Sequence, residues 1–503
     1  MGVYKLLLVV LIIKCFALSN VGARVSQYAF PKDFKFGIAT SAIQVEGGWN
    51  QSDKSENMWD RYVHTHPENI TDGSNHDVST DSYHFYKDDV RLVRDMGLDI
   101  YRFSISWTRI LPTGMDDKIS EDGVAYYNNL INELLKYNIT PMVTIYHWEL
   151  PQILHEFGGW TNPLIVNYFE DYARVVFRLF GDRVKFWLSI NEPHQTCHFG
   201  YGHITLVPRY YSTGLGEYLC AHYNLLAHAK VYHLYDREFR PTQKGIIGVT
   251  MDTFYGEPRT NSTEDRDAAE MYNQMHFGLY CHPIFSEKGD YPEIVRRTID
   301  EKSSLQGLSR SRLPSFTAEE VTYVRGTFDF LGLNHYTTVL VQAGADPPGA
   351  EPSRPFDMGV LEYRDPAWKM TQSSWLRVFP EGFRKILNWI KREYGNVPIV
   401  VTENGVSNLP VLEDYDRVEY FNLYLEQLLL ALHEDKVNVT TYIAWSLMDS
   451  FEWLSGYTQS FGLHQVDFKS PQKTRTPRLS AHNLKEIVKS RFIDFDKFAA
   501  KKP

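Results

Sequence analysis

The sequence is poor in cysteine, and this limits how the fold can be held together. Four cysteines occur among 503 residues, and Cys15 lies in an apolar N-terminal stretch that we expect to be removed. The other three, Cys197, Cys220 and Cys281, cannot all pair within one chain, so at most one disulfide forms. The fold must therefore depend on its hydrophobic core.

Several classes of partner are excluded in the same way. The net charge is −10 and no block of lysine or arginine occurs, which argues against nucleic acid. No C-x-x-C or H-E-x-x-H pattern is present, so we expect neither a structural metal nor any other cofactor. After the N-terminus no run of about 18 apolar residues follows, and we expect no membrane span.

The N-terminus has the pattern of a secretory signal peptide. Lys5 precedes the apolar stretch LLLVVLIIKCFAL, and VGA at 21–23 supplies small residues for cleavage after Ala23. We therefore expect residues 1–23 to be a signal peptide and residues 24–503 to form a single secreted domain. N-x-S/T sequons fit that compartment, although a proline follows the one at Asn138; they lie at Asn50, Asn69, Asn138, Asn261 and Asn438.

Eight short segments rich in β-branched and aromatic residues are spread over the mature chain. Most are apolar nearly throughout, as expected for parallel strands that are covered on both faces. The segments are FKFGIATSA (34–42), LDIYRFSISW (98–107), TPMVTIYHW (140–148), KFWLSINEP (185–193), KGIIGVTMD (244–252), FDFLGLNHYTT (328–338), PIVVTENGV (398–406) and TTYIAWSLMD (440–449).

Helical patterns lie between these segments, with apolar residues at i, i+3 and i+4. They cover residues 88–97, 124–138, 165–181, 382–395 and 417–435, and several end at Gly or Asn. This alternation predicts an α/β fold, a single (β/α)8 TIM barrel. The long gaps after the fifth and eighth strands predict extended loops at the C-terminal mouth of the strands.

Two glutamates stand at the ends of predicted strands. Glu192 ends the fourth segment in INEP, and Glu403 ends the seventh in VTENG. Active sites of this fold lie at the carboxyl ends of the strands, so the two side chains are expected to meet at the mouth. Further polar residues fall at the same level: Gln44, Arg102, His147, Asn191, Tyr336 and Glu452. Burying so many polar groups without a function would be costly.

Two carboxylates facing one bond are the apparatus of glycoside hydrolysis. At a separation of about 5–5.5 Å, one attacks the sugar carbon while the other protonates the leaving oxygen and then activates water. Arg102 and Tyr336 would stabilise the anion of Glu403. The apolar residues before Glu192, together with the charge of Glu403, would keep Glu192 protonated.

The motifs strongly resemble those of glycoside hydrolase family 1, the β-glucosidase family, from about Phe30 to Arg491, in a secreted, insect-like form. The matching stretches, in order, are FKFGIATSAIQVEG, YRFSISWTRILP, YHWELPQ, INEP, GLNHYTT, VTENGVS and AWSLMDSFEWLSGY. The resemblance implies that Glu192 is the acid/base and Glu403 the nucleophile of a retaining reaction. It further implies that hydroxyls of the terminal sugar bind Gln44, His147, Asn191, Glu452 and Trp453. Trp445 would cover the sugar ring, and Trp375 would be a platform for the leaving group.

The chain departs from the family pattern at three positions. Ser450 stands where the family usually has asparagine before Phe-Glu-Trp, and Ser460 stands where an arginine usually precedes Phe-Gly-Leu. His194 follows Asn-Glu-Pro in place of a bulky apolar or aromatic residue. The two serines put the preference for particular sugar hydroxyls in doubt, and His194 bears on leaving-group choice or proton supply.

Three functions are consistent with these residues. The leading hypothesis is a secreted retaining β-glucosidase that acts on a small-molecule β-glycoside and needs no cofactor. A thioglucosidase is the neighbouring alternative, and it requires a cationic group beside Trp375. A non-catalytic carbohydrate-binding protein is the alternative of another class, although such a protein is expected to lack one carboxylate. The sequence leaves three questions open. They are whether the enzyme prefers glucose, galactose or fucose, whether it also catalyses transglycosylation, and whether it forms a homodimer.

Overall fold

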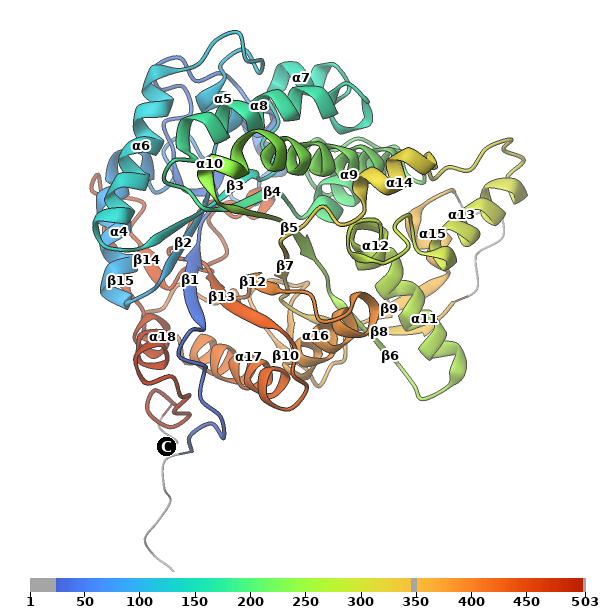
Figure 1. Ribbon diagram of the computed structural model, residues 1–503. Coiled ribbons are helices and arrows are strands. Elements are labelled where there is room, and N and C mark those ends of the chain that lie inside the picture. The colour runs from blue at the N-terminus through green and yellow to red at the C-terminus, as the bar shows by residue number, and fades with distance from the viewer. Residues whose placement is uncertain (1–23, 345–350, 501–503) are drawn as a thin grey trace, which may run out of the picture.

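The protein folds around a closed barrel of eight parallel strands, seen in the computed structural model, which describes residues 24–344 and 351–500 (Figure 1). The strands follow one another around the barrel in the order β1-β13-β12-β7-β5-β4-β3-β2. Their bounds are β1 Lys35–Ala39, β2 Ile100–Ser104, β3 Thr140–Tyr146, β4 Phe186–Asn191, β5 Ile246–Asp252, β7 Phe330–Asn334, β12 Ile399–Glu403 and β13 Val439–Trp445. Seven lie within the predicted segments and β13 begins one residue before its segment, at Val439, and the predicted (β/α)8 barrel is confirmed.

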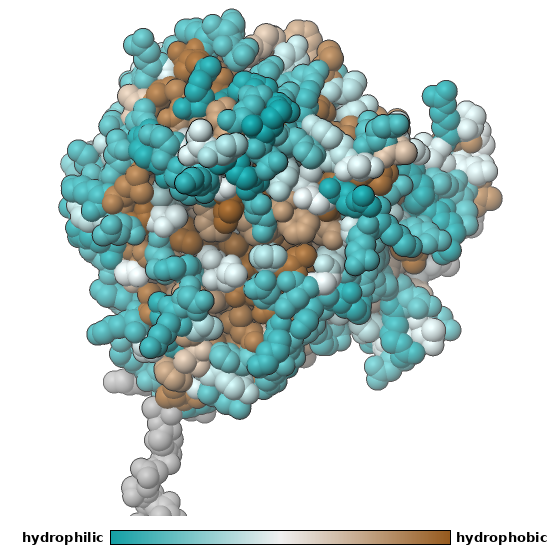
Figure 2. Space-filling model, viewed as in Figure 1, coloured by the Kyte–Doolittle hydropathy of each residue, from teal (hydrophilic) through white to brown (hydrophobic). Residues whose placement is uncertain are grey.

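Helices cover the outside of the barrel between successive strands (Figure 1). The larger ones are α4 Ser82–Met96, α6 Glu121–Lys136, α8 Ile165–Phe180, α9 Gly216–Leu234, α16 Glu381–Tyr394, α17 Tyr415–His433 and α18 Leu479–Ser490. In α8 the buried residues Phe169, Tyr172 and Val176 recur at helical spacing, while Arg178 is exposed. That apolar stripe packs on the barrel. Figure 2 shows hydrophilic side chains over these outer helices and hydrophobic ones in the middle of the same face.

The remaining elements lie in long connections. After β5 come β6 Tyr255–Pro258, α11 Thr263–Asn273, η5 Gln274–Gly278, α12 Leu279–Phe285, α13 Glu293–Leu305 and α14 Ala318–Val324. After β7 come β8 Thr338–Ala343, α15 Arg354–Met358, β9 Val360–Tyr363, β10 Lys369–Met370 and β11 Arg377–Val378. After β13 come η6 Trp453–Ser455, β14 His464–Val466 and β15 Arg475–Pro477. The loops predicted after the fifth and eighth strands are present, and the long one after β7 was not predicted.

The shorter elements lie in the connections after β1, β2, β3 and β4. They are α2 Ala42–Val45, α3 Met58–Thr65, η1 Pro67–Asn69, α5 Trp107–Ile110, α7 Gln152–Glu156, η2 Gly159–Thr161, η3 Gln195–Gly202, η4 Tyr235–Phe239 and α10 Arg240–Gln243. None of the helices within 24–344 and 351–500 is long and apolar enough to cross a membrane. The predicted signal peptide, residues 1–23, lies outside the described residues.

One disulfide forms, in agreement with the limit set by the cysteine count. Cys197 and Cys220 are bonded, and they join η3, after β4, to α9. Cys281 is a buried free thiol in α12. The bond closes a loop of 23 residues in sequence, next to the segment that follows Glu192.

A buried ion pair fixes the connection after β13. The guanidinium of Arg478 donates to both carboxylate oxygens of Asp449, at 2.8 and 2.7 Å, and neither side chain is more than 7 % exposed. The hydroxyl of Ser460 donates to the same carboxylate at 2.5 Å. The pair therefore ties the segment that carries Glu452 to the start of α18.

Replacing one partner of this pair should be costly, because the other charge would stay buried without compensation. We expect Asp449→Ala to lower the free energy of unfolding by about 3–5 kcal/mol. Chemical denaturation followed by circular dichroism measures this. Glu133→Ala, which breaks an exposed pair with Lys136, is the control and should cause no measurable loss. Equal stability of the two variants would show that the Asp449 pair does not hold the fold.

Candidate active site

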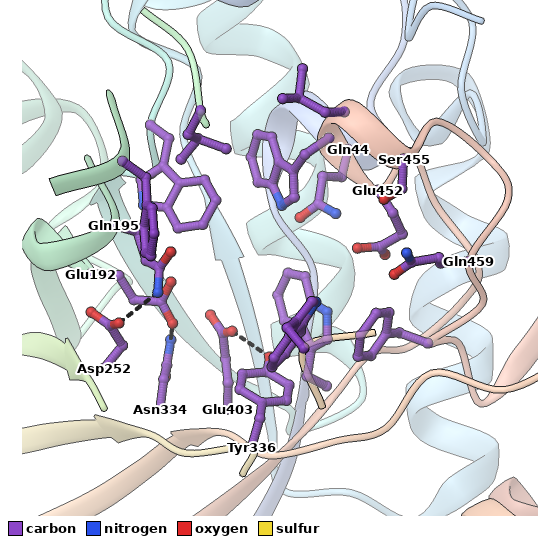
Figure 3. Close-up of a pocket in the computed structure, with 18 of the residues that line it drawn as sticks. Gln44, Glu192, Gln195, Asp252, Asn334, Tyr336, Glu403, Glu452, Ser455 and Gln459 are labelled. Carbon is purple, nitrogen blue, oxygen red and sulfur yellow. Dashed lines mark hydrogen bonds between the residues drawn. The ribbon is translucent and has the colours of Figure 1, made fainter. Parts of the chain in front are cut away.

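A cavity of about 390 Å³ lies at the carboxyl ends of the barrel strands. Most of the residues predicted for the site line it: Gln44, His147, Glu192, Tyr336, Trp375, Glu403, Trp445, Glu452 and Trp453. Arg102 and Asn191 contribute through hydrogen bonds to these groups. Glu192, Gln195, Asp252 and Asn334 gather at one end of the cavity, Gln44, Glu452 and Gln459 at the other, with Glu403 and Tyr336 between them (Figure 3).

Glu403 is the last residue of β12, and the two residues that follow it hold it in place. Asn404 is fully buried, and its amide bonds the backbone carbonyl of His335 and the hydroxyl of Tyr442. Gly405 has no room for a side chain, because a Cβ there would lie 2.0 Å from the carbonyl oxygen of Trp445. The sequence Glu-Asn-Gly thus anchors the strand end and turns it sharply.

The carboxylate of Glu403 has a cation and a hydroxyl as partners. Nη1 of Arg102 donates to Oε1 at 2.5 Å, and the hydroxyl of Tyr336 donates to Oε2 at 2.7 Å. Arg102 is 1 % exposed and Glu403 4 %, so this charge-assisted pair is shielded from water. Both contacts favour the ionised form of Glu403.

Glu192 has a different environment. It follows β4 with a backbone φ of +49°, a left-handed conformation that costs a glutamate of the order of 1–3 kcal/mol. Its amide nitrogen donates to the carbonyl of Thr250 on β5, and its Oε1 accepts a hydrogen bond of 2.6 Å from the Asn334 side chain. No cation bonds it among the described residues. The strained turn aims this carboxyl into the cavity.

A chain of hydrogen bonds connects the two carboxyls. Nη2 of Arg102 donates to the Asn191 side-chain oxygen at 2.6 Å, and Asn334 donates to the same oxygen at 3.2 Å. Asn191 in turn contacts Nε2 of His147 at 3.2 Å. Displacing any one of these side chains would therefore move both glutamates.

Burial and neighbouring charges separate the two carboxyls electrostatically. Burial raises the pKa of Glu403, but Arg102 and Tyr336 oppose this rise. Burial raises the pKa of Glu192 well above its usual range, and the charges of Asp252 and Glu403 raise it further. Two neighbouring buried carboxyls do not both ionise readily, so the proton lies on Glu192. The predicted division between a proton donor and an anion agrees with these environments.

Polar groups with unused hydrogen-bonding capacity form the end of the cavity near Glu452. Burial raises the pKa of Glu452 to about 8, so near neutral pH this carboxyl can both donate and accept. Burial and the charge of Arg102 lower the pKa of His147 well below its usual range, which keeps the ring neutral. Its Nδ1 has no partner within the described part of the chain. The Gln44 amide is partly engaged, by Ser41 and the carbonyl of Phe451.

Aromatic rings line both ends of the cavity. Trp445, the last residue of β13, lies 6.0 Å from the His147 ring at an angle of 22°, and Trp453 lies 6.1 Å from the same ring. Trp375, in the connection after β7, stacks on Phe254 with a centroid distance of 5.4 Å and an angle of 7°. Flat apolar faces of this kind suit the C–H face of a sugar and a planar leaving group.

Several lining residues were not singled out from the sequence. Asp252 and Asn334 end β5 and β7, Gln195 follows Glu192, and Phe254 and Gln459 come from connections. The rule that active-site residues lie at strand ends applied equally to Asp252 and Asn334, and it would have found both. The other three carried no comparable signal.

The three departures from the family pattern lie at or near this cavity. The hydroxyl of Ser450 donates to Glu452 at 3.1 Å, and that of Ser460 donates to Asp449. His194 lies behind the cavity wall, where its Nδ1 contacts the Asp252 carboxylate at 2.9 Å. Each departure therefore touches a carboxylate rather than the bulk of the core.

Comparison with known proteins agrees with the fold and the site. Myrosinase 1 of the aphid Brevicoryne brassicae is 47% identical over 464 residues, 92% of this chain and 98% of that protein. Human lactase/phlorizin hydrolase is 43% identical over 91% of the chain, but the match spans only 24% of that larger protein. The solved structure of an aphid myrosinase superposes with a TM-score of 0.88 at 46% identity, covering 92% and 99% of the two chains. A rice β-glucosidase mutant superposes with a TM-score of 0.87 at 36% identity, with the same coverage.

The model of glycosyl hydrolase family 1 matches residues 26–492, which include every element of the barrel and every residue of the cavity. The barrel, the two buried glutamates and these similarities agree with one another, and the chain belongs to glycosyl hydrolase family 1.

Proposed function

We propose that this glycosidase is a secreted, retaining β-glucosidase that removes terminal non-reducing β-D-glucosyl residues from disaccharides or glucosides. The observation that carries the proposal is the contrast between two buried carboxyls in one cavity. Glu403 is bonded to a cation and a hydroxyl, whereas the Glu192 carboxyl bonds the Asn334 amide and has carboxylates as neighbours. One is suited to be a nucleophile and the other a proton donor.

The reaction proceeds in two displacements. Glu403 attacks the anomeric carbon while Glu192 gives its proton to the leaving oxygen, so the glycosidic bond breaks and a glucosyl–Glu403 ester forms. Glu192, now ionised, takes a proton from water, which attacks the same carbon and releases Glu403. The rice relative, a glutamate-to-glutamine mutant, was solved in a covalent complex with glucose, which supports this route.

The polar end of the cavity binds the sugar. Each sugar hydroxyl needs both a donor and an acceptor. The hydroxyls bind to Gln44, His147, Asn191, Glu452 and Trp453. Trp445 covers the ring face. The leaving group lies at the end of the cavity that Glu192 occupies, on the stacked rings of Trp375 and Phe254.

Secretion, removal of residues 1–23 and a single catalytic domain over residues 24–503 are part of the proposal. Asn50, Asn69, Asn138 and Asn261 are exposed, as glycosylation requires. Asn438 is only partly exposed and its amide nitrogen contacts the carbonyl of Asn396, so it and Asn138, whose sequon is followed by proline, are the poorest acceptors of the five.

Replacing each glutamate separately tests the two roles. We expect Glu192→Gln to lower kcat for an alkyl β-glucoside about 10²–10⁴-fold, because its leaving group needs a proton. A dinitrophenyl β-glucoside, whose leaving group needs none, should form the glucosyl enzyme normally. Glu403→Gln should abolish turnover of both. Steady-state and burst kinetics measure these effects, and proton NMR should show β-glucose as the first product.

Glu68→Gln, at an exposed glutamate that does not line the cavity, is the matched control and should behave as the wild type. First release of α-glucose would rule out retention. Absence of turnover of any glycoside by the folded wild type would leave a carbohydrate-binding protein as the function to test.

Tyr336→Phe tests how the anion of Glu403 is stabilised. The variant removes a 2.7 Å hydrogen bond that favours the ionised carboxyl, so the pKa of Glu403 should rise. The acidic limb of kcat/KM should then move to higher pH, because Glu403 attacks only when ionised. A pH profile measures this. Tyr323→Phe, on the outer helix α14, should leave the profile unchanged.

A thioglucosidase acting on sulfated thioglucosides is the second candidate, and two observations favour it. The aphid relative with 47% identity is named a myrosinase. The cation that this function needs beside Trp375 is present: Nε of Arg364 contacts the Trp375 carbonyl at 3.4 Å, and its guanidinium lies 6.0 Å from the Phe254 ring. Against it, the carboxylate of Asp252 lines the same end of the cavity and would repel a sulfate.

Arg364→Met distinguishes the two candidates. If a sulfated leaving group binds near Arg364, kcat/KM for a sulfated thioglucoside should fall about tenfold, which corresponds to about 1.4 kcal/mol. The value for an aryl O-glucoside should not change. Arg392→Met, on the outer face of α16, is the control. Wild-type turnover mainly of the thioglucoside would make this second candidate the function.

A further inference from the structure

Asp252, the last residue of β5, lies next to Glu192 at the leaving-group end of the cavity (Figure 3). Its Oδ2 accepts two hydrogen bonds, from Nδ1 of His194 at 2.9 Å and from the Gln195 amide at 2.7 Å. Its Oδ1 is buried and has no partner within the described residues. The side chain is 6 % exposed, so its position is fixed by His194 and Gln195 and not by solvent.

The backbone brings this carboxylate close to Glu192. In the barrel β4, β5 and β7 are neighbours, and Asn191 pairs with Thr250 while Asp252 pairs with Asn334. Glu192 bonds the carbonyl of Thr250, and Asn334 bonds Glu192. Asp252 therefore lies close to Glu192 on both sides of β5. On one side β4 leads into Glu192, and on the other β7 ends in Asn334, which bonds Glu192.

The histidine does not cancel the charge of Asp252. Burial lowers the pKa of His194, and the positive charge of Arg354 lowers it as well, against the opposing effect of Asp252. A neutral His194 that donates from Nδ1 orients the carboxylate and leaves its negative charge in place. The pair thus keeps a net negative charge beside Glu192.

Other titratable groups surround the pair on several elements. They are His198 on η3, Glu217 on α9, Tyr272 on α11, His276 on η5, Tyr280 and Cys281 on α12, and the cation Arg354 on α15. On the cavity side, Glu192 faces Glu403, Tyr336 and Arg102. Burial and nearby charge lower the pKa of His198 and His276 well below the usual range, so neither adds a positive charge. Arg102 is already paired with Glu403.

We propose that Asp252, oriented by His194 and Gln195, is a positioning residue whose fixed negative charge keeps Glu192 protonated as the proton donor. This rests on the function proposed above. Among the charges that raise the pKa of Glu192, Asp252 has a larger effect than Glu403. The charge of Glu403 disappears when it bonds to the sugar, whereas that of Asp252 persists through both displacements. The unusual His194 then has a role, since an apolar residue could not orient Asp252.

The pH dependence of the reaction tests the charge of Asp252. Asp252→Asn keeps the size of the side chain and removes the charge, so Glu192 should ionise at lower pH. For an alkyl β-glucoside we expect the alkaline limb of kcat/KM to move down by about one pH unit. A dinitrophenyl β-glucoside does not need the proton, and its profile should lack that movement. A purely structural defect would lower kcat/KM equally for both substrates.

Two further variants keep this test decisive. Asp252→Ser replaces the asparagine variant if that variant folds poorly. It also removes the charge, so it should move the alkaline limb in the same direction. Asp182→Asn removes an exposed aspartate between α8 and β4 and should leave the limb unchanged. Thermal unfolding of each variant establishes that it is folded. An alkaline limb unmoved in folded Asp252→Asn overturns the proposal.

A readout without substrate separates this inference from the proposed function. The infrared carboxyl band of Glu192, assigned by its loss in Glu192→Gln, should disappear at lower pH in Asp252→Asn than in the wild type. A band that moves in a protein without β-glucosidase activity would refute the function and keep the effect of Asp252. A band that does not move, in an active enzyme, would refute the inference alone.

Discussion

The buried guanidinium of Arg102 is the group on which the rest of the site depends. It comes from β2 and donates to Glu403 and the carbonyl of Thr402 on β12, and to Asn191 on β4. A guanidinium that is 1 % exposed is tolerable only when its donors are satisfied and its charge is paired. Moving β2 or β12 by one residue would turn the side chains of that strand to the other face and leave the charge of Arg102 unpaired. The barrel register and the catalytic geometry therefore stabilise each other.

This arrangement also explains why the two carboxyls differ. β2 is near enough to β12 and β4 for Arg102 to reach both, but on β4 it bonds Asn191 and not Glu192. Within the described residues the Glu192 carboxyl accepts a hydrogen bond from the Asn334 amide alone, and the side chain lies against the cavity after a left-handed backbone turn. In a low-dielectric interior this difference in partners is sufficient to leave the proton on one of two neighbouring carboxyls. The separation of roles follows from which strand end faces the cation.

The barrel and the glutamates could be predicted from the sequence because both depend on local patterns. Buried parallel strands are apolar nearly throughout, and a polar residue at the end of such a strand is conspicuous. Asn334 satisfied the same criterion but lay in a stretch whose motif drew attention to Tyr336, and Asp252 satisfied it in a segment that matched no motif. Phe254 and Arg364 could not have been found, because the path of the connections after β5 and β7 brings them to Trp375. The three-stranded sheet β6-β8-β9 sets this path. In it, β6 pairs with β8, which lies more than 80 residues further along the chain.

The two ends of the cavity are built differently, and this determines which end can change. At the end near Glu452, Gln44 bonds the carbonyl of Phe451 and Ser450 bonds Glu452, while Asn191 bonds Arg102, the partner of Glu403. A substitution there leaves buried polar partners without a hydrogen bond, at a cost of roughly 1–3 kcal/mol for each group left unpaired. At the leaving-group end, Trp375, Phe254 and Arg364 come from connections outside the barrel network. Such residues can be exchanged without disturbing Arg102, Glu403 or Glu192, which is consistent with relatives named β-glucosidase and myrosinase sharing one barrel. Asp252 belongs to both parts of the site: its backbone lies in the barrel strand β5, while its orientation depends on hydrogen bonds from His194 and Gln195 in the segment after β4.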